Sequence, residues 1–248
     1  MSRLAVDMAR CLDPVQFARS VGFEPYQWQK DVLRSDYQRL LLNCHRQAGK
    51  TDICGLKGAH VSIYEPGSSI LGISRTERQA KELFKKFLTH VEAVDRPVAI
   101  DAQNATTAVL GNGSTFTSLP GTGDTIRGHS NVRLLLIDEA ARVPDETVAA
   151  CRPMLAVSGG QMIAMSTPAG RRGWWYDAWE NGGNAYERYM VKAEDCPRIS
   201  AEFLEAERAA LGQWAYASEY ECSFESNSSS VFTPDDLDNL IHPEVEQW

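Results

Sequence analysis

Four short runs of almost continuous apolar residues constrain the fold of this chain more than any other feature. They lie at 39–44, 68–74, 131–139 and 161–167. Such runs are typical of strands buried on both faces, and helical patterns separate them along the chain. Strands that alternate with helices favour a parallel sheet with helices on both faces. We therefore predict an α/β fold with a mostly parallel sheet, whose ligand site lies at the carboxyl ends of the strands.

The remaining local signals fit this interpretation. Thr76 followed by Gln79 is a capping-box signature, and the apolar residues behind it recur at helical spacing. A second helix is expected over 50–64, directly after the first apolar run. The segment 109–117 carries a Gly-Asn-Gly turn and predicts a β-hairpin. Near the carboxyl end, a short charged helix is expected over 201–211.

The composition limits the classes of protein to which the chain can belong. Its 248 residues are 43% hydrophobic and 23% charged, which is a globular composition, and no apolar run approaches the ~18–20 residues of a membrane span. The formal net charge of −8 argues against a basic coat for nucleic acid but leaves a local basic groove open. The 6 cysteines contain no C-x-x-C pair, which favours reduced thiols. We expect a soluble protein that is not secreted and has no membrane partner.

Residues 44–51, with the sequence Cys-His-Arg-Gln-Ala-Gly-Lys-Thr, are similar to a phosphate-binding loop. The usual pattern is G-x-x-x-x-G-K-[ST], and here Cys44 stands in place of the first glycine. In such a loop, backbone N–H groups and a helix N-terminus bind phosphates. Lys50 would reach the β- and γ-phosphates, and the Thr51 hydroxyl would bind Mg²⁺. The alternative is a chance Gly-Lys-Thr at a strand–helix turn, so the tripeptide needs a second signal.

The second signal is a pair of carboxylates at the end of the third apolar run. Asp138 and Glu139 follow four aliphatic residues. Asp138 suits the magnesium side of a site, and Glu139 suits a base that orients or deprotonates an attacking water. The alternative is a surface turn, because strands often end in acidic residues. Taken together, the two motifs predict a triphosphate–magnesium pocket where the tips of two neighbouring strands meet, with Lys50 beside Glu139.

Two arginines compete for one further role. Arg127 lies in the glycine-rich loop 121–128, where a cation could stabilise charge that develops on the transferred phosphoryl group. Its alternative is a solvated loop arginine. Arg46, inside the phosphate loop, could serve the same purpose, or it could pin the loop to a neighbouring element.

Three polar residues complete the candidate site. Ser166 and Thr167 follow the fourth apolar run, where a hydroxyl could sense the γ-phosphate, or where Thr-Pro could simply end the strand. Gln29 follows Trp28, and its amide offers the donor and acceptor that an adenine edge needs. An N-terminal helix that packs Trp28 and Val32 into the core is the alternative for this segment, and both can hold. The histidines have no metal-ligand spacing.

The order of these motifs resembles that of a known family. The stretches are Trp-Gln at 28–29, LLNCHRQAGKT at 41–51, TIRG at 125–128, LLLIDEAA at 134–141 and STP at 166–168. This combination is similar to the ATPase domain of large terminase subunits, the DNA-packaging motors of tailed bacteriophages. The absence of the first glycine is common in that family's phosphate loops, and the resemblance spans about residues 22–235.

The resemblance implies a P-loop RecA-like ATPase core with a small lid subdomain, and ATP and Mg²⁺ as cofactors. It implies that Lys50 and Thr51 contact phosphates and Mg²⁺, that Asp138 is the metal-side acid and that Glu139 is the catalytic glutamate. Gln29 would contact adenine, and Ser166 with Thr167 would couple hydrolysis to movement. Arg127 matches an arginine finger supplied to a neighbouring subunit, with Arg46 as the rival in cis. The other nucleotide-binding residues it implies are Arg46, Gln47, Ala48 and Gly49.

The resemblance also implies partners and a domain arrangement. The expected partners are double-stranded DNA, the portal protein and procapsid, the small terminase subunit, and further copies in a homo-oligomeric ring that assembles from monomers in the host cell cytoplasm. We expect an adenine-side and lid contribution from 1–35, the ATPase core over 36–195, a lid or linker over 196–230, and a tail over 231–248. Large terminases usually continue into a nuclease domain, and the 231–248 tail is too short for one. We therefore expect no DNA cleavage by this chain.

Two other classes of function stay open from the sequence. A helicase-like DNA-remodelling ATPase shares the acidic strand end, but it normally needs a second RecA-like domain for which the chain is too short. A non-motor P-loop kinase or nucleotide switch would need an acceptor pocket and a mobile basic lid, for which Arg171-Arg172 is the nearest candidate.

Overall fold

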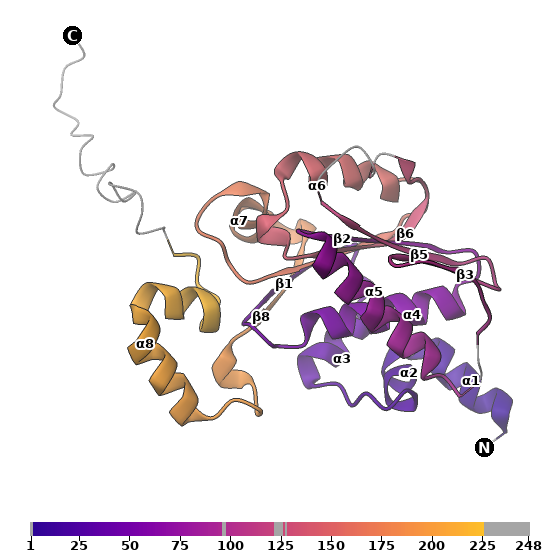
Figure 1. Cartoon of the computed structure of the whole chain (residues 1–248), viewed down its shortest axis with the longest axis horizontal. Coiled ribbons are helices and arrows are strands. Elements are labelled where there is room, and N and C mark those ends of the chain that lie inside the picture. Colours follow the sequence, from indigo (N-terminus) through magenta and orange to yellow (C-terminus); the bar gives the residue numbers. More distant parts are fainter. Residues whose placement is uncertain (1, 96–97, 122–125, 127, 226–248) are drawn as a thin grey trace, which may run out of the picture.

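The computed structural model describes residues 2–95, 98–121, 126 and 128–225. A central sheet separates two layers of helices (Figure 1). Helices α1 to α5 cover one face, α6 and α7 cover the other, and α8 lies beside the sheet at the β8 edge. The fold class predicted from the alternation of strands and helices is therefore observed. The part of the chain that the structure describes contains no helix with the length and apolar character that would cross a bilayer.

The bounds of the elements are as follows. The strands are β1 (Arg39–Cys44), β2 (Ser69–Ser74), β3 (Ile100–Gln103), β4 (Thr107–Leu110), β5 (Thr115–Pro120), β6 (Val132–Asp138), β7 (Gln161–Ser166) and β8 (Glu187–Val191). The α-helices are α1 (Arg3–Leu12), α2 (Pro14–Ser20), α3 (Gln27–Arg34), α4 (Lys50–Tyr64), α5 (Glu77–Glu92), α6 (Asp145–Cys151), α7 (Gly173–Glu180) and α8 (Ala201–Tyr220).

The strands of the described residues form one sheet in the order β3-β4-β5-β2-β6-β7-β1-β8. The pairs from β5 to β8 are parallel, and the β3–β4 and β4–β5 pairs are antiparallel. This order corrects one expectation. The strand before the phosphate loop, β1, and the strand before the two carboxylates, β6, are not neighbours, because β7 lies between them and pairs with both. The tip of β7 therefore occupies the middle of the predicted pocket.

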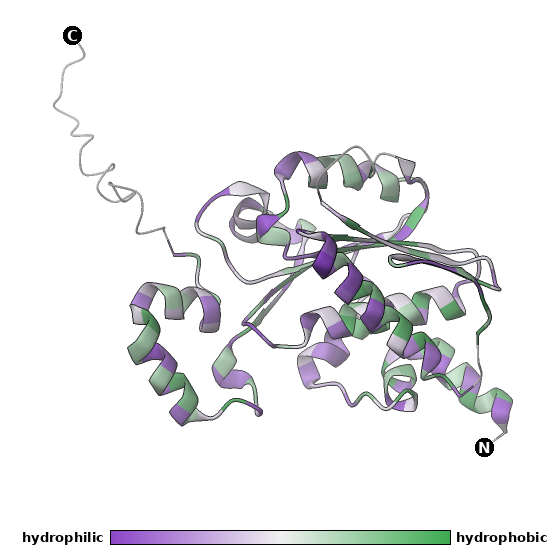
Figure 2. Ribbon diagram, in the orientation of Figure 1, coloured by the Kyte–Doolittle hydropathy of each residue, from purple (hydrophilic) through white to green (hydrophobic). Residues whose placement is uncertain are grey.

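Each face of the sheet buries its own apolar core. On the α2–α5 side, the rings of Phe87 and Phe116 stack with centroids 4.0 Å apart. On the α6–α7 side, Trp175 is 1% exposed and packs in a cluster with Ile137 of β6. Hydrophobic and hydrophilic residues alternate along α5, as an amphipathic helix requires (Figure 2). Burial on both faces explains why these strands are apolar along their whole length.

Most of the predicted elements are confirmed. The Thr76 side chain caps α5 by accepting a hydrogen bond from the Gln79 N–H, and the predicted helix over 50–64 is α4. The predicted hairpin corresponds to β4 and β5. The helix expected over 201–211 is longer, because α8 continues to Tyr220 after a break at Gly212, whose φ of 73° and ψ of 163° are not helical.

Candidate nucleotide site

The loop between β1 and α4 has the backbone of a phosphate-binding loop. Gly49 precedes α4 with a φ of 85°, a left-handed conformation that glycine adopts without steric cost. A Cβ at this position would also lie 3.3 Å from the Gln29 Nε2 atom. Gln47 is left-handed as well, with a φ of 62°, which is uncommon for a residue other than glycine. The loop is therefore held in a conformation that its own residues do not favour, as is frequent at binding sites.

Two flanking elements hold this loop in place. The His45 N–H donates to the Val191 carbonyl at the end of β8, and the Arg46 N–H donates to the Glu219 carbonyl of α8. The Arg46 guanidinium pairs with the Glu219 carboxylate. Arg198, from the segment before α8, donates to the Gln47 carbonyl at 3.0 Å. The structure thus supports the alternative in which Arg46 pins the loop to a neighbouring element.

The two predicted motifs meet at the carboxyl edge of the sheet. The Lys50 Nζ atom lies 3.9 Å from the Glu139 Oε1 atom, although β7 separates the two strands. The Thr51 hydroxyl donates to the Asp138 Oδ2 atom at 3.3 Å. Lys50 is 8% exposed and Asp138 is 4% exposed, so both charged groups lie largely out of water. Four residues from two segments of the chain therefore form one compact charged cluster.

The Asp138 carboxyl is in an environment that disfavours its charge. Burial raises its pKa to about 6, and the adjacent Glu139 carboxylate adds to that rise. Lys50, the Glu139 N–H and the Thr51 hydroxyl act in the opposite direction. A cation beside Asp138 would therefore relieve an unfavourable charge.

The donor set fits Mg²⁺ bound together with phosphates. A hydroxyl and a carboxylate are hard oxygen ligands, and Mg²⁺ typically takes one or two protein oxygens, with waters and substrate phosphates completing its shell. Within the described ranges, no group of three or more His, Cys, Asp or Glu side chains is arranged to hold a metal by itself. Thr51 and Asp138 therefore suit a metal that arrives with a nucleotide.

Glu139 is held by its backbone and by its side chain. Its φ of 53° and ψ of 42° are left-handed, which costs of order 1–3 kcal/mol for a residue with a side chain. Its Oε2 atom accepts a hydrogen bond from Arg142 Nη1 at 3.0 Å. The Glu139 carboxylate thus lies between two cations, Lys50 and Arg142.

Arg142 was not among the residues singled out from the sequence. Its Nη1 atom also donates to the Thr167 hydroxyl at 3.2 Å, so one guanidinium contacts both the carboxylate of Glu139 and the segment after β7. The signal in the sequence is an arginine three residues after Glu139. This spacing brings the two side chains together only because Ala140–Arg142 form a 3-10 turn.

Ser166 and Thr167 are in contact with the acidic strand end. The Ser166 hydroxyl accepts a hydrogen bond from the Ala141 N–H at 3.2 Å, and Thr167 accepts from Arg142. Both residues are buried. The tip of β7 is therefore connected to the turn that follows Glu139.

Gln29 lies against the phosphate loop from the other side. It is 2% exposed, and its Oε1 atom accepts a hydrogen bond from the Tyr26 N–H at 2.9 Å. Its Nε2 atom faces Gly49, and the Arg198 guanidinium lies 5.8 Å from the centre of the Tyr26 ring. Gln29 therefore packs as the alternative expected, while its amide nitrogen stays beside the loop. Arg127 and the tail over 231–248 lie outside the described residues.

Comparisons with known proteins agree with this geometry. Residues 42–238 match the family model described as terminase large subunit, T4likevirus-type, N-terminal. The large terminase subunits of Thermus phage G20c and Thermus virus P23-45 are each 25% identical over 94% of this chain. The chain spans about half the length of these curated relatives, 55% of each.

Solved structures show the same fold. The large terminase ATPase domain of Thermus phage P74-26 matches with a TM-score of 0.72 and 23% identity, over 84% of this chain and 97% of that one. The large terminase of another thermophilic bacteriophage, in complex with ADP, matches with a TM-score of 0.67 and 14% identity, over 80% of this chain and 53% of that one. These likenesses confirm the predicted RecA-like P-loop core. The family match covers most of the chain, and the chain belongs to the T4likevirus-type large terminase subunits, in their N-terminal region.

Proposed function

We propose that this chain binds ATP with Mg²⁺ and hydrolyses it to move double-stranded viral DNA into a procapsid. The observation that carries this proposal is the cluster of Lys50 and Thr51 with Asp138 and Glu139 at one edge of the sheet. Family membership favours this function over the kinase and helicase alternatives, for which no observation speaks separately.

The phosphate loop is the proposed seat of the triphosphate. Its backbone from Gln47 to Gly49 and the N-terminus of α4 face the phosphates, and Lys50 neutralises charge on the β- and γ-phosphate oxygens. Thr51 and Asp138 hold Mg²⁺, which neutralises charge on the phosphate oxygens when it is bound. The amide of Gln29, beside Gly49, meets the adenine edge.

Glu139 is the proposed catalytic base. Its carboxylate, 3.9 Å from Lys50, orients the attacking water and accepts its proton as the bond to the γ-phosphorus forms. Ser166 and Thr167 transmit the change in the γ-phosphate to the sheet, because they contact the turn after Glu139. Arg127 is proposed to stabilise the transition state from a neighbouring subunit, and Arg46 does so in cis if it leaves Glu219.

The assembly is part of the same proposal. Copies of the chain form a ring on the portal of the procapsid, with the small terminase subunit as a further partner, in the host cell cytoplasm. The segments 1–35 and 196–230 contribute the lid, since α8 contacts the phosphate loop through Glu219. A ring gathers weak DNA contacts from several subunits, which suits a chain of net charge −8.

Turnover of ATP by wild type and Glu139→Gln tests the catalytic part. The substitution keeps the size of the side chain and removes its basicity, so we expect turnover to fall about 10²–10⁴-fold while nucleotide binding persists. Glu82→Gln, an exposed position on α5, is the matched control and should turn over like wild type. Stimulation of turnover by portal-bearing procapsids tests the motor part, and robust phosphorylation of a small acceptor without them would contradict it.

A further inference from the structure

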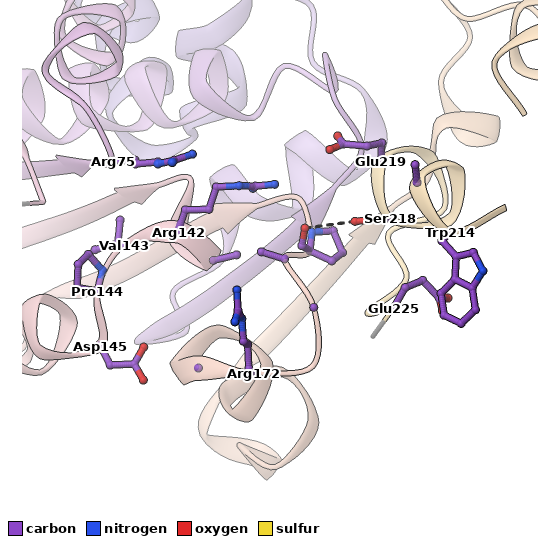
Figure 3. A pocket seen from close by; sticks show the side chains of 16 residues that line it. Arg75, Arg142, Val143, Pro144, Asp145, Arg172, Trp214, Ser218, Glu219 and Glu225 are labelled. Atoms are coloured by element: carbon purple, nitrogen blue, oxygen red, sulfur yellow. Dashed lines mark hydrogen bonds between the residues drawn. The ribbon is translucent and has the colours of Figure 1, made fainter. Parts of the chain in front are cut away.

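A hollow of about 720 Å³ lies beside the candidate nucleotide site and is lined by neither Lys50 nor Thr51. Arg75, directly after β2, Arg142 and Arg172, directly before α7, extend into it from three segments of the chain (Figure 3). Trp214 of α8, which is 51% exposed, lines the same hollow. Three arginines around one opening make it a local concentration of positive charge on a chain of net charge −8.

The carboxylates that line this hollow are already engaged. Asp145 accepts a hydrogen bond from the Trp174 N–H at 3.1 Å, Glu219 pairs with Arg46, and Glu225 accepts from the Ser223 hydroxyl at 2.6 Å. Arg75 and Arg172, in contrast, are exposed and form no ion pair or side-chain hydrogen bond with any residue that the structure describes. Two guanidinium groups are thus free to bind an anion in the hollow.

Arg142 connects the hollow to the site of hydrolysis. Its guanidinium donates to Glu139 at 3.0 Å and to Thr167 at 3.2 Å, while the side chain also lines the hollow. A carboxylate that accepts a hydrogen bond from a cation is a weaker base. An anion that draws Arg142 into the hollow would therefore release Glu139 for its proposed role.

We propose that the hollow binds a backbone phosphate of duplex DNA and that Arg142 transmits its occupancy to Glu139. The guanidinium fork matches phosphate oxygens, and most protein–DNA hydrogen bonds go to phosphate and sugar. The acidic remainder of the chain repels DNA, so contact has to come from a local basic surface such as this one. The coupling to Glu139 rests on the proposed function, whereas the binding site does not.

The binding site is tested with a fluorescein-labelled duplex of about 30 base pairs and the full chain. Arg75→Ala combined with Arg172→Ala should weaken binding at least about tenfold and reduce the slope of log affinity against log salt by about two, since two phosphate contacts are lost. The matched control combines Arg3→Ala with Lys85→Ala, two exposed cations away from the hollow, and should bind like wild type.

A second arm of the same titration identifies the source of the phosphate. Inorganic phosphate should displace the duplex only as weakly as chloride at equal ionic strength, if a backbone phosphate is the ligand. Specific displacement by inorganic phosphate would assign the hollow to the free ion instead. Equal duplex binding by both double variants and wild type would overturn the proposal.

The coupling is tested by turnover with and without the duplex. DNA should stimulate wild type, and Arg142→Ala should turn over without DNA at the rate that wild type reaches with it. An Arg142→Ala variant that still requires DNA, or that is inactive under both conditions while its circular dichroism matches wild type, would overturn the coupling. Binding of a fluorescent ATP analogue in the same samples separates the two proposals, because its loss in wild type would contradict the nucleotide site alone.

Discussion

The two edges of the parallel sheet carry similar polar residues in opposite conditions. At the carboxyl edge, Asp138, Glu139 and Lys50 lie close together, and the backbone of Glu139 is left-handed. At the amino edge, the Lys57 ammonium donates to the Leu33 carbonyl at 2.7 Å, and a hollow of about 270 Å³ is lined by residues that include Lys57.

At the amino edge the polar groups satisfy one another within the chain. Arg133 pairs with Glu65, and the Gln161 amide donates to the carbonyls of Ser35 and Tyr37. At the carboxyl edge, Asp138 stays in an environment that raises its pKa, and Glu139 has a strained backbone. Polar groups that are left unfavourable on one edge and balanced on the other mark the first edge as the ligand site.

The largest effect is expected from exchanging one lysine at each edge. Lys50→Met should reduce ATP turnover at least about 10²–10³-fold, because it removes the cation that faces the phosphate oxygens. Lys57→Met should leave turnover within about twofold, since that ammonium bonds only a helix carbonyl at the far edge. Equal losses in both variants, measured at saturating ATP, would abolish the distinction between the edges.

The next effect is on stability at the carboxyl edge. The pKa of Asp138 is raised from 3.8 to about 6 in the folded chain, so the stability that its protonated form provides is complete below about pH 4 and is lost as the pH rises through 6. Asp138→Asn should therefore stabilise the nucleotide-free chain at about pH 7 by up to about 3 kcal/mol and leave it unchanged at about pH 4. Urea unfolding at both pH values measures this, and a destabilised variant at neutral pH would show that the carboxylate is favourably paired.

A smaller effect separates two glycines of the same conformation. Gly49→Ala and Gly67→Ala both place a Cβ at positive φ, which costs about 1–2 kcal/mol. Only Gly49 has a close neighbour, the Gln29 Nε2 atom at 3.3 Å, whereas no atom lies within 4 Å of a Cβ at Gly67. Nucleotide titration should show weaker binding for Gly49→Ala alone, and equal affinities would remove Gln29 and Gly49 from the site.

The smallest effect is the titration of Lys57. Burial lowers its pKa from 10.5 to about 8, so the stability that its neutral form provides is complete above pH 10.5 and is lost as the pH falls through 8. The side chain is partly exposed, so we expect a rise of only about 1 kcal/mol between about pH 7.5 and 10 in wild type. Lys57→Met should lack this rise in urea unfolding, and a variant that kept it would assign the titration to another group.

The sequence allowed the strands, the phosphate loop and the meeting of Lys50 with Glu139 to be predicted, because each depends on local pattern. Continuous apolar runs reflect burial on both faces, and the cap at Thr76 is a contact between residues three apart. The order of strands in a sheet depends on contacts between distant segments, so the position of β7 between β1 and β6 was not predictable from periodicity.

Arg142 and Arg198 were missed for a related reason. Arg142 contacts Glu139 and Thr167 through a 3-10 turn and a strand tip that come together only in the folded chain. Arg198 reaches the Gln47 carbonyl from a segment far along the sequence. Neither residue belongs to a motif, so only the three-dimensional arrangement assigns them to the site. The roles of Gln29, Arg46 and Arg127 stay predictions.

The central claim is that one triphosphate and one metal bind between the phosphate loop and the acidic strand end. The most direct measurement is an experimental structure of the Glu139→Gln variant with ATP and Mg²⁺, since this variant should bind without turnover. We expect the γ-phosphate beside the Lys50 Nζ atom and the metal bound by Thr51, with Asp138 facing it. A triphosphate bound elsewhere, or a loop over 44–51 left empty at saturating ATP, would contradict the claim.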